Sequence, residues 1–235
     1  MKTARHVGSI LMLILAAGTS AAQADTVALW TFESLSDTPG AGPHAADVGS
    51  GSALGNRPTS SLYSSPVGNG SANSFSSSGW AIGDYYQFTV STIGFTDLAL
   101  RWDQTSSNTG PRDFRLAYST DGIAFTTAAN YSVLANASPN QTWNATTAIA
   151  AYTFTQSLAA IDLLENQALV YFRLIDNSTT SANGGTVAAG GTNRVDNFAV
   201  SATAAAPVPL PAAVWLLGSA LFGMAGVRRL GHKAA

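Results

Sequence analysis

Residues 168–176 read ALVYFRLID and carry the strongest strand signal in the chain. Apolar side chains occupy both alternating faces at the centre of this stretch, which is typical of a strand in the middle of a sheet. The sequence therefore predicts a central strand here, with other strands on both sides of it.

Other stretches alternate between apolar and polar residues, as half-buried strands do. In residues 97–104 (DLALRWDQ), Leu98, Leu100 and Trp102 share one face, and Asp103 lies on the other. The same pattern occurs in residues 85–91 (YYQFTVS) and 112–119 (RDFRLAYS), and shorter strand candidates are residues 123–127, 131–134 and 151–155.

The first and last strands are predicted at residues 27–33 (VALWTFE) and 194–202 (RVDNFAVSA). In the last strand, simple alternation places Asp196, Phe198 and Val200 together on one face and leaves Val195 on the other.

Residues 34–78 are rich in Gly, Ser and Pro, which predicts long loops with one short strand near residues 60–64. Residues 158–164 fit a helical turn or a strand, and both interpretations stay open.

Eight to ten short strands without an amphipathic helix predict an all-β, antiparallel two-sheet sandwich. A jelly-roll arrangement is favoured because long loops separate strands that do not pair as hairpins.

The N-terminus has the features of a secretory signal peptide, predicted over residues 1–24. Lys2 and Arg5 precede the apolar core 10–17, and Ala22-Gln23-Ala24 is a small-residue cleavage site. Export through the Sec machinery and cleavage after Ala24 would leave residues 25–204 as the sandwich ectodomain.

The C-terminus, residues 205–235, has an uncharged apolar run at 210–227 followed by Arg228 and Arg229. Eighteen helical residues rise about 27 Å, close to the hydrocarbon thickness of a bilayer. A single transmembrane helix with a cytoplasmic basic end is predicted, and a buried core helix is the alternative.

A proline motif lies just before this run, formed by Val208, Pro209, Leu210, Pro211 and Ala212. Together with the span and the basic end, it resembles the PEP-CTERM sorting signal in its VPLPA form, with Leu210 in place of the acidic residue of the commoner form. The resemblance implies a Gram-negative, exopolysaccharide-producing bacterium and an exosortase-type processing protease. It also implies an intermediate tethered to the inner membrane, followed by delivery to the cell surface or extracellular matrix.

The charge of the region between the two signals limits its partners. It holds six arginines, no lysine and all thirteen acidic residues, a net charge of −7. Nucleic acid is excluded as a partner because phosphate binding needs a basic patch. The chain has no cysteine, so its core or a metal has to hold it together without disulfides.

Catalytic chemistry has little support in the sequence, and no catalytic residue is predicted. His44 is the one histidine between the signals, and it lies in the stretch interpreted as loop. Hydrolytic triads need a base, usually histidine. A carboxylate pair for glycoside hydrolysis stays open among Asp103, Asp113 and Asp176, although nothing singles one out.

The first and last strands of a jelly roll often lie side by side, which would bring Glu33 near Asp196. The ending of the first strand at Glu33 and the R-V-D-N-F-x-V pattern of the last resemble the galactose-binding-like jelly rolls of carbohydrate-binding modules. That resemblance implies a structural Ca²⁺ ion bound by Glu33 and Asp196. The alternative is that both are ordinary acids at strand ends.

Ligand binding is predicted along the polar hairpin 102–113, through Trp102, Asp103, Asn108 and Arg112. Sugars stack on aromatic rings and hydrogen-bond to such polar side chains. The alternative for Trp102 is the core, because it shares a face with Leu98. Trp80, Trp143 and the loop 177–193 are further candidates for this site.

The sequence predicts a non-enzymatic surface or matrix protein, structural or adhesive in an exopolysaccharide context. A carbohydrate-binding module with a defined glycan ligand is the alternative, and a glycoside or polysaccharide hydrolase is the third interpretation.

Overall fold

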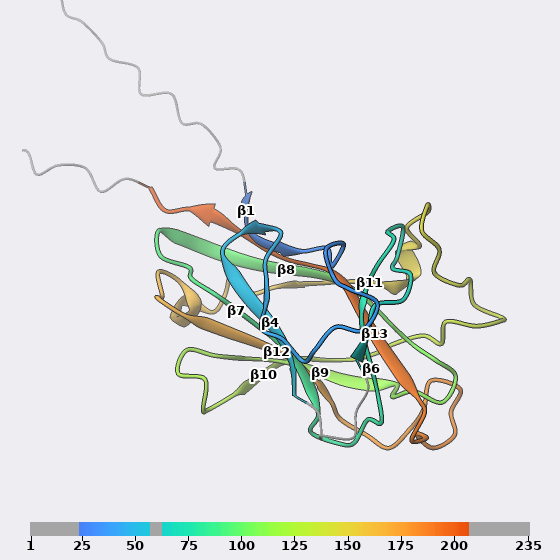
Figure 1. Cartoon of the computed structure of the whole chain (residues 1–235). Coiled ribbons are helices and arrows are strands. Elements are labelled where there is room, and N and C mark those ends of the chain that lie inside the picture. The colour runs from blue at the N-terminus through green and yellow to red at the C-terminus, as the bar shows by residue number, and fades with distance from the viewer. Residues whose placement is uncertain (1–23, 57–62, 207–235) are drawn as a thin grey trace, which may run out of the picture.

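Two antiparallel β-sheets face each other across a core of aromatic and aliphatic side chains (Figure 1). The computed structural model describes residues 24–56 and 63–206. The seven-stranded sheet contains, in order, β11 (Thr153–Ser157), β8 (Phe95–Ser106), β13 (Thr192–Ala204), β1 (Ala24–Trp30) and β3 (Val48–Gly49), with β6 (Phe75–Ser78) paired to β13 and β5 (Tyr63–Ser64) paired to β6. The six-stranded sheet contains, in order, β10 (Thr126–Ser132), β9 (Asp113–Ser119), β12 (Val170–Asp176), β7 (Tyr85–Val90), β4 (Gly51–Asn56) and β2 (His44–Ala45). Two 3-10 helices, η1 (Ala150–Tyr152) and η2 (Asp162–Leu164), lie in the connections.

The predicted all-β, jelly-roll-like sandwich is confirmed. β1 and β13 are antiparallel neighbours, with Ala24 opposite Thr203, so the described chain starts and ends at the same place (Figure 1). Within the described residues no helix has the length and hydropathy needed to cross a bilayer. The predicted signal-peptide helix, the span 210–227 and the sorting motif lie outside the described residues.

The predicted central strand 168–176 forms β12 (Val170–Asp176), which lies between β9 and β7 as expected. Val170, Phe172 and Leu174 are fully buried between the sheets. The alternation predicted for β7, β8 and β9 is also confirmed, and its inward side chains are Tyr86, Phe88, Val90, Leu98, Leu100, Trp102, Phe114 and Leu116.

The prediction of a hairpin at residues 102–113 is wrong. β8 belongs to the seven-stranded sheet and β9 to the six-stranded sheet, so the segment between them crosses from one sheet to the other. Polar turn residues fit such a crossing as well as a hairpin, and only the pairing partners distinguish the two. The Asp-Gly turn after β9 does form a hairpin, with Gly122 at φ 73° and β10 paired to β9.

The prediction for the faces of the last strand is wrong because β13 contains a β-bulge. Asp196 is opposite Asp103, yet Ala199 is already opposite Arg101, so one extra residue is inserted on β13. Asn197 adopts φ 48° there. The bulge reverses the alternation of side chains along the strand, so Asp196 does not face the core. Before the bulge Val195 faces the core, and after it Phe198, Val200 and Ala202 do so as well.

Residues 34–78 contain more strands than predicted. β5 lies at the end of the expected strand near 60–64, but β4 also forms and pairs with β7 and β2, and β6 pairs with β13 and β5. β4 (GSALGN) has no apolar signal because its inward positions are small. A Cβ atom on Gly51 would lie 2.8 Å from a Trp30 ring carbon, so an aromatic ring occupies the space of a side chain.

Aromatic rings join the two sheets. Phe88 of β7 and Phe198 of β13 stack with centroids 3.5 Å apart and planes 2° from parallel. Trp30 packs edge-on against both rings. Each fully buried side chain of this size contributes about 1.5–3 kcal/mol by leaving water, so these rings replace the disulfides that the chain lacks.

Gly51→Ala is expected to destabilise the protein by about 1–3 kcal/mol, because the added methyl would lie 2.6 Å from the Thr89 carbonyl oxygen and 2.8 Å from Trp30. Chemical denaturation measures this loss. Gly40→Ala is the matched control, since a Cβ atom there meets nothing within 4 Å. Equal stability of the two variants would contradict the close packing of β4 on Trp30.

Candidate functional site

Glu33 and Asp196, the predicted cation ligands, both bind the loop formed by residues 67–74. The Glu33 carboxylate accepts hydrogen bonds from the backbone N–H groups of Ala72 (3.2 Å) and Asn73 (2.9 Å). Asp196 Oδ2 accepts one from the Ser71 hydroxyl at 2.7 Å. Asp196 belongs to β13, and Glu33 lies three residues after the end of the neighbouring strand β1, so the predicted first strand 27–33 ends earlier than expected. The two acids hold one loop between them, while their role as cation ligands stays a prediction.

Oxygen atoms converge beside Gly68 in this loop. A Cβ atom on Gly68 would lie 2.0 Å from Ser71 Oγ and 2.3 Å from both the Asn73 carbonyl oxygen and Asp196 Oδ2. The Ser71 hydroxyl has one proton but two acceptors in reach, Asp196 Oδ2 and, at 3.1 Å, the Asn73 carbonyl. Carboxylate and carbonyl oxygens are ligands that Ca²⁺ takes in proteins, so these two donor types suit the ion.

Asp196 is fully buried beside a second carboxylate. Asp103 is its partner across β8 and β13, and the Asn197 amide donates to Asp196 Oδ2 at 3.1 Å and to Asp103 Oδ2 at 3.0 Å. Burial, with a smaller contribution from the charge of Asp103, raises the pKa of Asp196 to about 7. A proton or a cation would therefore stabilise this position. No group of three or more His, Cys, Asp or Glu side chains gathers in the described part of the chain, so the loop oxygens would complete any cation site.

The four predicted ligand residues do not share one surface. Trp102 is 2% exposed and stacks on Phe154, so it is a core residue. Asp103 is fully buried on the opposite face of β8. Asn108 and Arg112 lie on the crossing segment, and their part in ligand binding stays a prediction.

The loop predicted as a rim does meet the crossing segment. Arg112 N donates to the Thr180 carbonyl at 3.0 Å, and Asn183 N donates to the Asn108 carbonyl at 3.0 Å. Trp80 and Trp143, the other predicted stacking platforms, are 6% and 4% exposed. Trp80 nevertheless lines a pocket of about 290 Å³ together with Ser178 and Val187 of the predicted rim loop.

A different surface has the residues that a sugar needs, namely the outer face of the six-stranded sheet. Strand pairing places Arg173 of β12 between Gln87 of β7 and Ala117 of β9. The next row, about 6.7 Å away, has Ile175 between Tyr85 and Arg115. Tyr171 lies in the row on the other side of Arg173. We call this surface the Tyr–Arg face and define it by Tyr85, Gln87, Arg115, Phe125, Tyr171 and Arg173.

Arg173 is held rigidly at the centre of the Tyr–Arg face. Its guanidinium carbon lies 3.9 Å from the centroid of the Tyr85 ring and 3.7 Å from that of Phe125. Its Nε donates to Gln87 Oε1 at 2.8 Å. Burial lowers the pKa of Arg173 from its usual value. Cation–π contacts on two rings fix the orientation of the guanidinium plane, so the face is organised before any ligand arrives.

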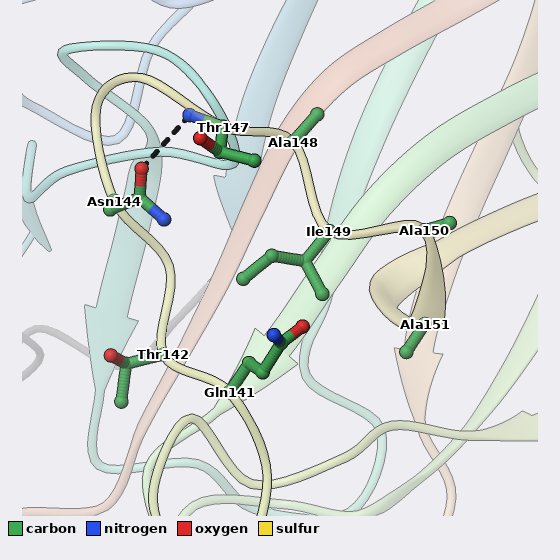
Figure 2. A pocket seen from close by; sticks show the side chains of 8 residues that line it. All are labelled: Gln141, Thr142, Asn144, Thr147, Ala148, Ile149, Ala150 and Ala151. Carbon is green, nitrogen blue, oxygen red and sulfur yellow. Dashed lines mark hydrogen bonds between the residues drawn. The ribbon is translucent and has the colours of Figure 1, made fainter.

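A separate pocket of about 700 Å³ lies in the loop between β10 and β11 (Figure 2). The Asn144 side-chain oxygen accepts a hydrogen bond from Thr147 N at 2.9 Å, as Figure 2 shows. Its lining combines Gln141, Thr142, Asn144 and Thr147 with Ala148, Ile149, Ala150 and Ala151. Without an aromatic ring or a charged group, it offers a sugar less than the Tyr–Arg face does.

Comparison with known proteins gives remote similarities only. No protein-family model matches the chain, and no curated protein matches its sequence. The K1 cleaved adhesin domain of Lys-gingipain from Porphyromonas gingivalis has a TM-score of 0.41 and 11% identity, over 78% of this chain and 99% of that one. A family 29 carbohydrate-binding module has a TM-score of 0.38 and 12% identity, over 81% of this chain and 99% of the module. TmCBM61 in complex with β-1,4-galactotriose has a TM-score of 0.37 and 7% identity, over 64% of this chain and 86% of TmCBM61.

Adhesin domains and carbohydrate-binding modules are therefore among the solved structures that this chain resembles, in line with the resemblance noted in the sequence. At these TM-scores and identities, the likenesses establish neither a family nor a function.

Sequence reasoning missed the Tyr–Arg face, although the signal was present in the opening stretch. In ALVYFRLID, Tyr171, Arg173 and Ile175 alternate with the inward residues and lie on the same face of β12. The apolar and aromatic residues on both faces were interpreted only as the sign of a strand in the middle of a sheet. The arginine between them was the sign that the second face meets solvent or a ligand.

Without calcium, stability is expected to fall as the pH rises from about 4 to 7. The folded pKa of Asp196 is raised above its unfolded value, so the folded state keeps a proton that the unfolded state releases. Adding Ca²⁺ at pH 7 should raise the melting temperature, because a ligand that binds only the folded state stabilises it. Thermal melts in EGTA and in millimolar Ca²⁺ measure both effects.

Asp196→Asn is the matched variant, since it keeps the shape and removes the titrating charge. It should lose both the pH dependence and the calcium response. If the melting temperature of the natural protein does not change with calcium anywhere in this pH range, a cation at Asp196 is contradicted.

Proposed function

We propose that this chain is an exported surface or matrix protein, non-enzymatic, whose β-sandwich binds polysaccharide through the Tyr–Arg face. The observation that carries the proposal is the clamped Arg173, with Tyr85, Phe125 and Gln87 around it on an outer sheet face. Aromatic rings stack on the C–H faces of sugars, while amides and guanidinium groups bind their hydroxyls.

The carboxylates considered for hydrolysis support a non-enzymatic role. Asp103 and Asp176 are 0% and 1% exposed. Asp113 is more open, but the hydrogen bond from Arg112 lowers its pKa to about 2. A general acid working near neutral pH needs a raised pKa at a carboxyl that substrate reaches.

Export and sorting are part of the same proposal and rest on the sequence. The signal peptide would direct the chain through Sec, and the C-terminal span would tether it until an exosortase-type protease processes it. The described domain begins at Ala24 and runs to 206, so both proposed signals would be attached at the same side of the sandwich.

Tyr171→Ala is expected to weaken polysaccharide binding about tenfold or more, because a half-buried ring on the Tyr–Arg face is lost. A glycan array of neutral and acidic polysaccharides identifies the ligand, and calorimetry on the full chain in mild detergent measures the affinity. Leu163→Ala, which removes a 51% exposed side chain from η2, is the control and should bind normally. Binding to no glycan above millimolar affinity would refute the proposal and leave a structural role.

Mass spectrometry of the protein from its native cell is expected to find Asp25 at the N-terminus and no residues from the 213–235 region at the C-terminus. Processing at the proline motif would remove the span. A mature protein that still carries residues 210–227 would contradict sorting and indicate a permanent membrane anchor.

A further inference from the structure

We infer that the Tyr–Arg face selects an acidic polysaccharide, one whose uronate carboxylates are bound by Arg115 and Arg173. This inference rests on the proposed function and names the ligand class of that site.

Arg173 has hydrogen-bonding capacity that the described residues do not use. Its Nε donates to Gln87, and its guanidinium carbon lies within 4 Å of the ring centroids of Tyr85 and Phe125, at 3.9 and 3.7 Å. Neither Nη1 nor Nη2 forms a hydrogen bond or ion pair with the residues that the structure describes. A ligand approaching along the plane of the guanidinium would meet its outer N–H groups, which is the geometry that a carboxylate binds in a bidentate manner.

Arg115 is the stronger sign of a missing partner. Its Nε is shielded from water and has no hydrogen-bond partner within the described chain. Leaving a buried donor of a charged group unsatisfied is costly, so an acceptor supplied by a ligand would recover that cost. Arg115 also forms no ion pair there, in contrast to Arg112 and Arg101, which lie 2.9 Å and 3.6 Å from aspartate oxygens.

The two arginines are close enough to act on one chain of sugar. Arg173 is opposite Ala117, two residues along β9 from Arg115 on the same face. Such diagonal neighbours lie about 7–8 Å apart between Cα atoms. Two arginines whose Cα atoms have this spacing, with Tyr171 in the row beyond Arg173, form a short track across the sheet.

Two acidic residues near the Tyr–Arg face, Asp113 of β9 and Asp121 of the following turn, are already bound. Asp113 accepts hydrogen bonds from Nε and Nη2 of Arg112, at 2.9 and 3.1 Å. It also accepts hydrogen bonds from the hydroxyls of Ser132 and Ser178. Asp121, in the β9–β10 turn, accepts backbone N–H groups of its own turn and the Ser119 hydroxyl. Neither neutralises Arg115 or Arg173. In a domain with a net charge of −7, two arginines left without acids mark a local preference for an anion.

The test compares uronate oligomers with the same oligomers after reduction of their carboxyls to alcohols. Short oligogalacturonate, alginate and hyaluronan fragments are the probes, titrated into the full chain in mild detergent. At least one acidic oligomer should bind tenfold or more tightly than its reduced form, because hydrogen bonds between charged groups are about twice as strong as neutral ones.

Arg115→Gln should weaken uronate binding about 10- to 100-fold and change binding of the reduced oligomer little. Arg115→Lys keeps the charge but not the planar fork, so it should restore only part of the affinity. Since neither variant removes a hydrogen bond or ion pair within the described chain, neither should lower the melting temperature, and Arg115→Gln should raise it slightly by removing an unsatisfied buried donor. Arg101→Gln, on the other sheet, is the control and should bind as the natural protein does.

Equal affinity for acidic and reduced oligomers would overturn the inference and leave polysaccharide binding in place. Tight binding of neutral glycans alone, unaffected by Arg115→Gln, would do the same. Absence of binding to every probe would also overturn it, and the glycan array would then decide whether the proposed function fails with it.

Discussion

One inserted residue in β13 governs both the core and the loop beside Asp196. Without the bulge at Asn197, strict alternation would point the Asp196 carboxylate into the core beside Phe198. With it, Val195 and Phe198 both face inward, and Asp196 meets Ser71 and the Asn69 backbone on the other side. An uncompensated carboxylate in that core would cost far more than the strained backbone of a single asparagine.

The two sheets use their outer faces differently. Loops cover the outer face of the seven-stranded sheet near Asp103 and Asp196, so its polar groups are bound within the protein. The outer face of the six-stranded sheet keeps half-buried aromatic rings and two arginines that lack carboxylate partners in the described chain. The internally bonded polar groups and the proposed ligand-binding residues therefore lie on opposite sides of one sandwich, and the aromatic core between them keeps both sheets in place without disulfides.

Much of the fold could be predicted from local pattern, because burial on one face imposes a period of two. β7, β8, β9 and β12 follow this rule. β4 does not, since Gly51 and Gly55 make room for the rings of Trp30 and Tyr63, which belong to strands of the other sheet. The site was predicted less well. A tryptophan can stack on a sugar or pack in a core, and Trp102 packs in the core. Residue type alone does not distinguish these two roles.

The amino-acid sequence by itself determined the all-β class, the central strand and the dependence on a core without disulfides. These follow from periodicity and composition, which are properties of neighbouring residues. Only the tertiary structure decided which residues share a surface. Tyr85, Arg115 and Arg173 are separated by dozens of positions, and strand pairing with a fixed register, sheet by sheet, is what places them side by side.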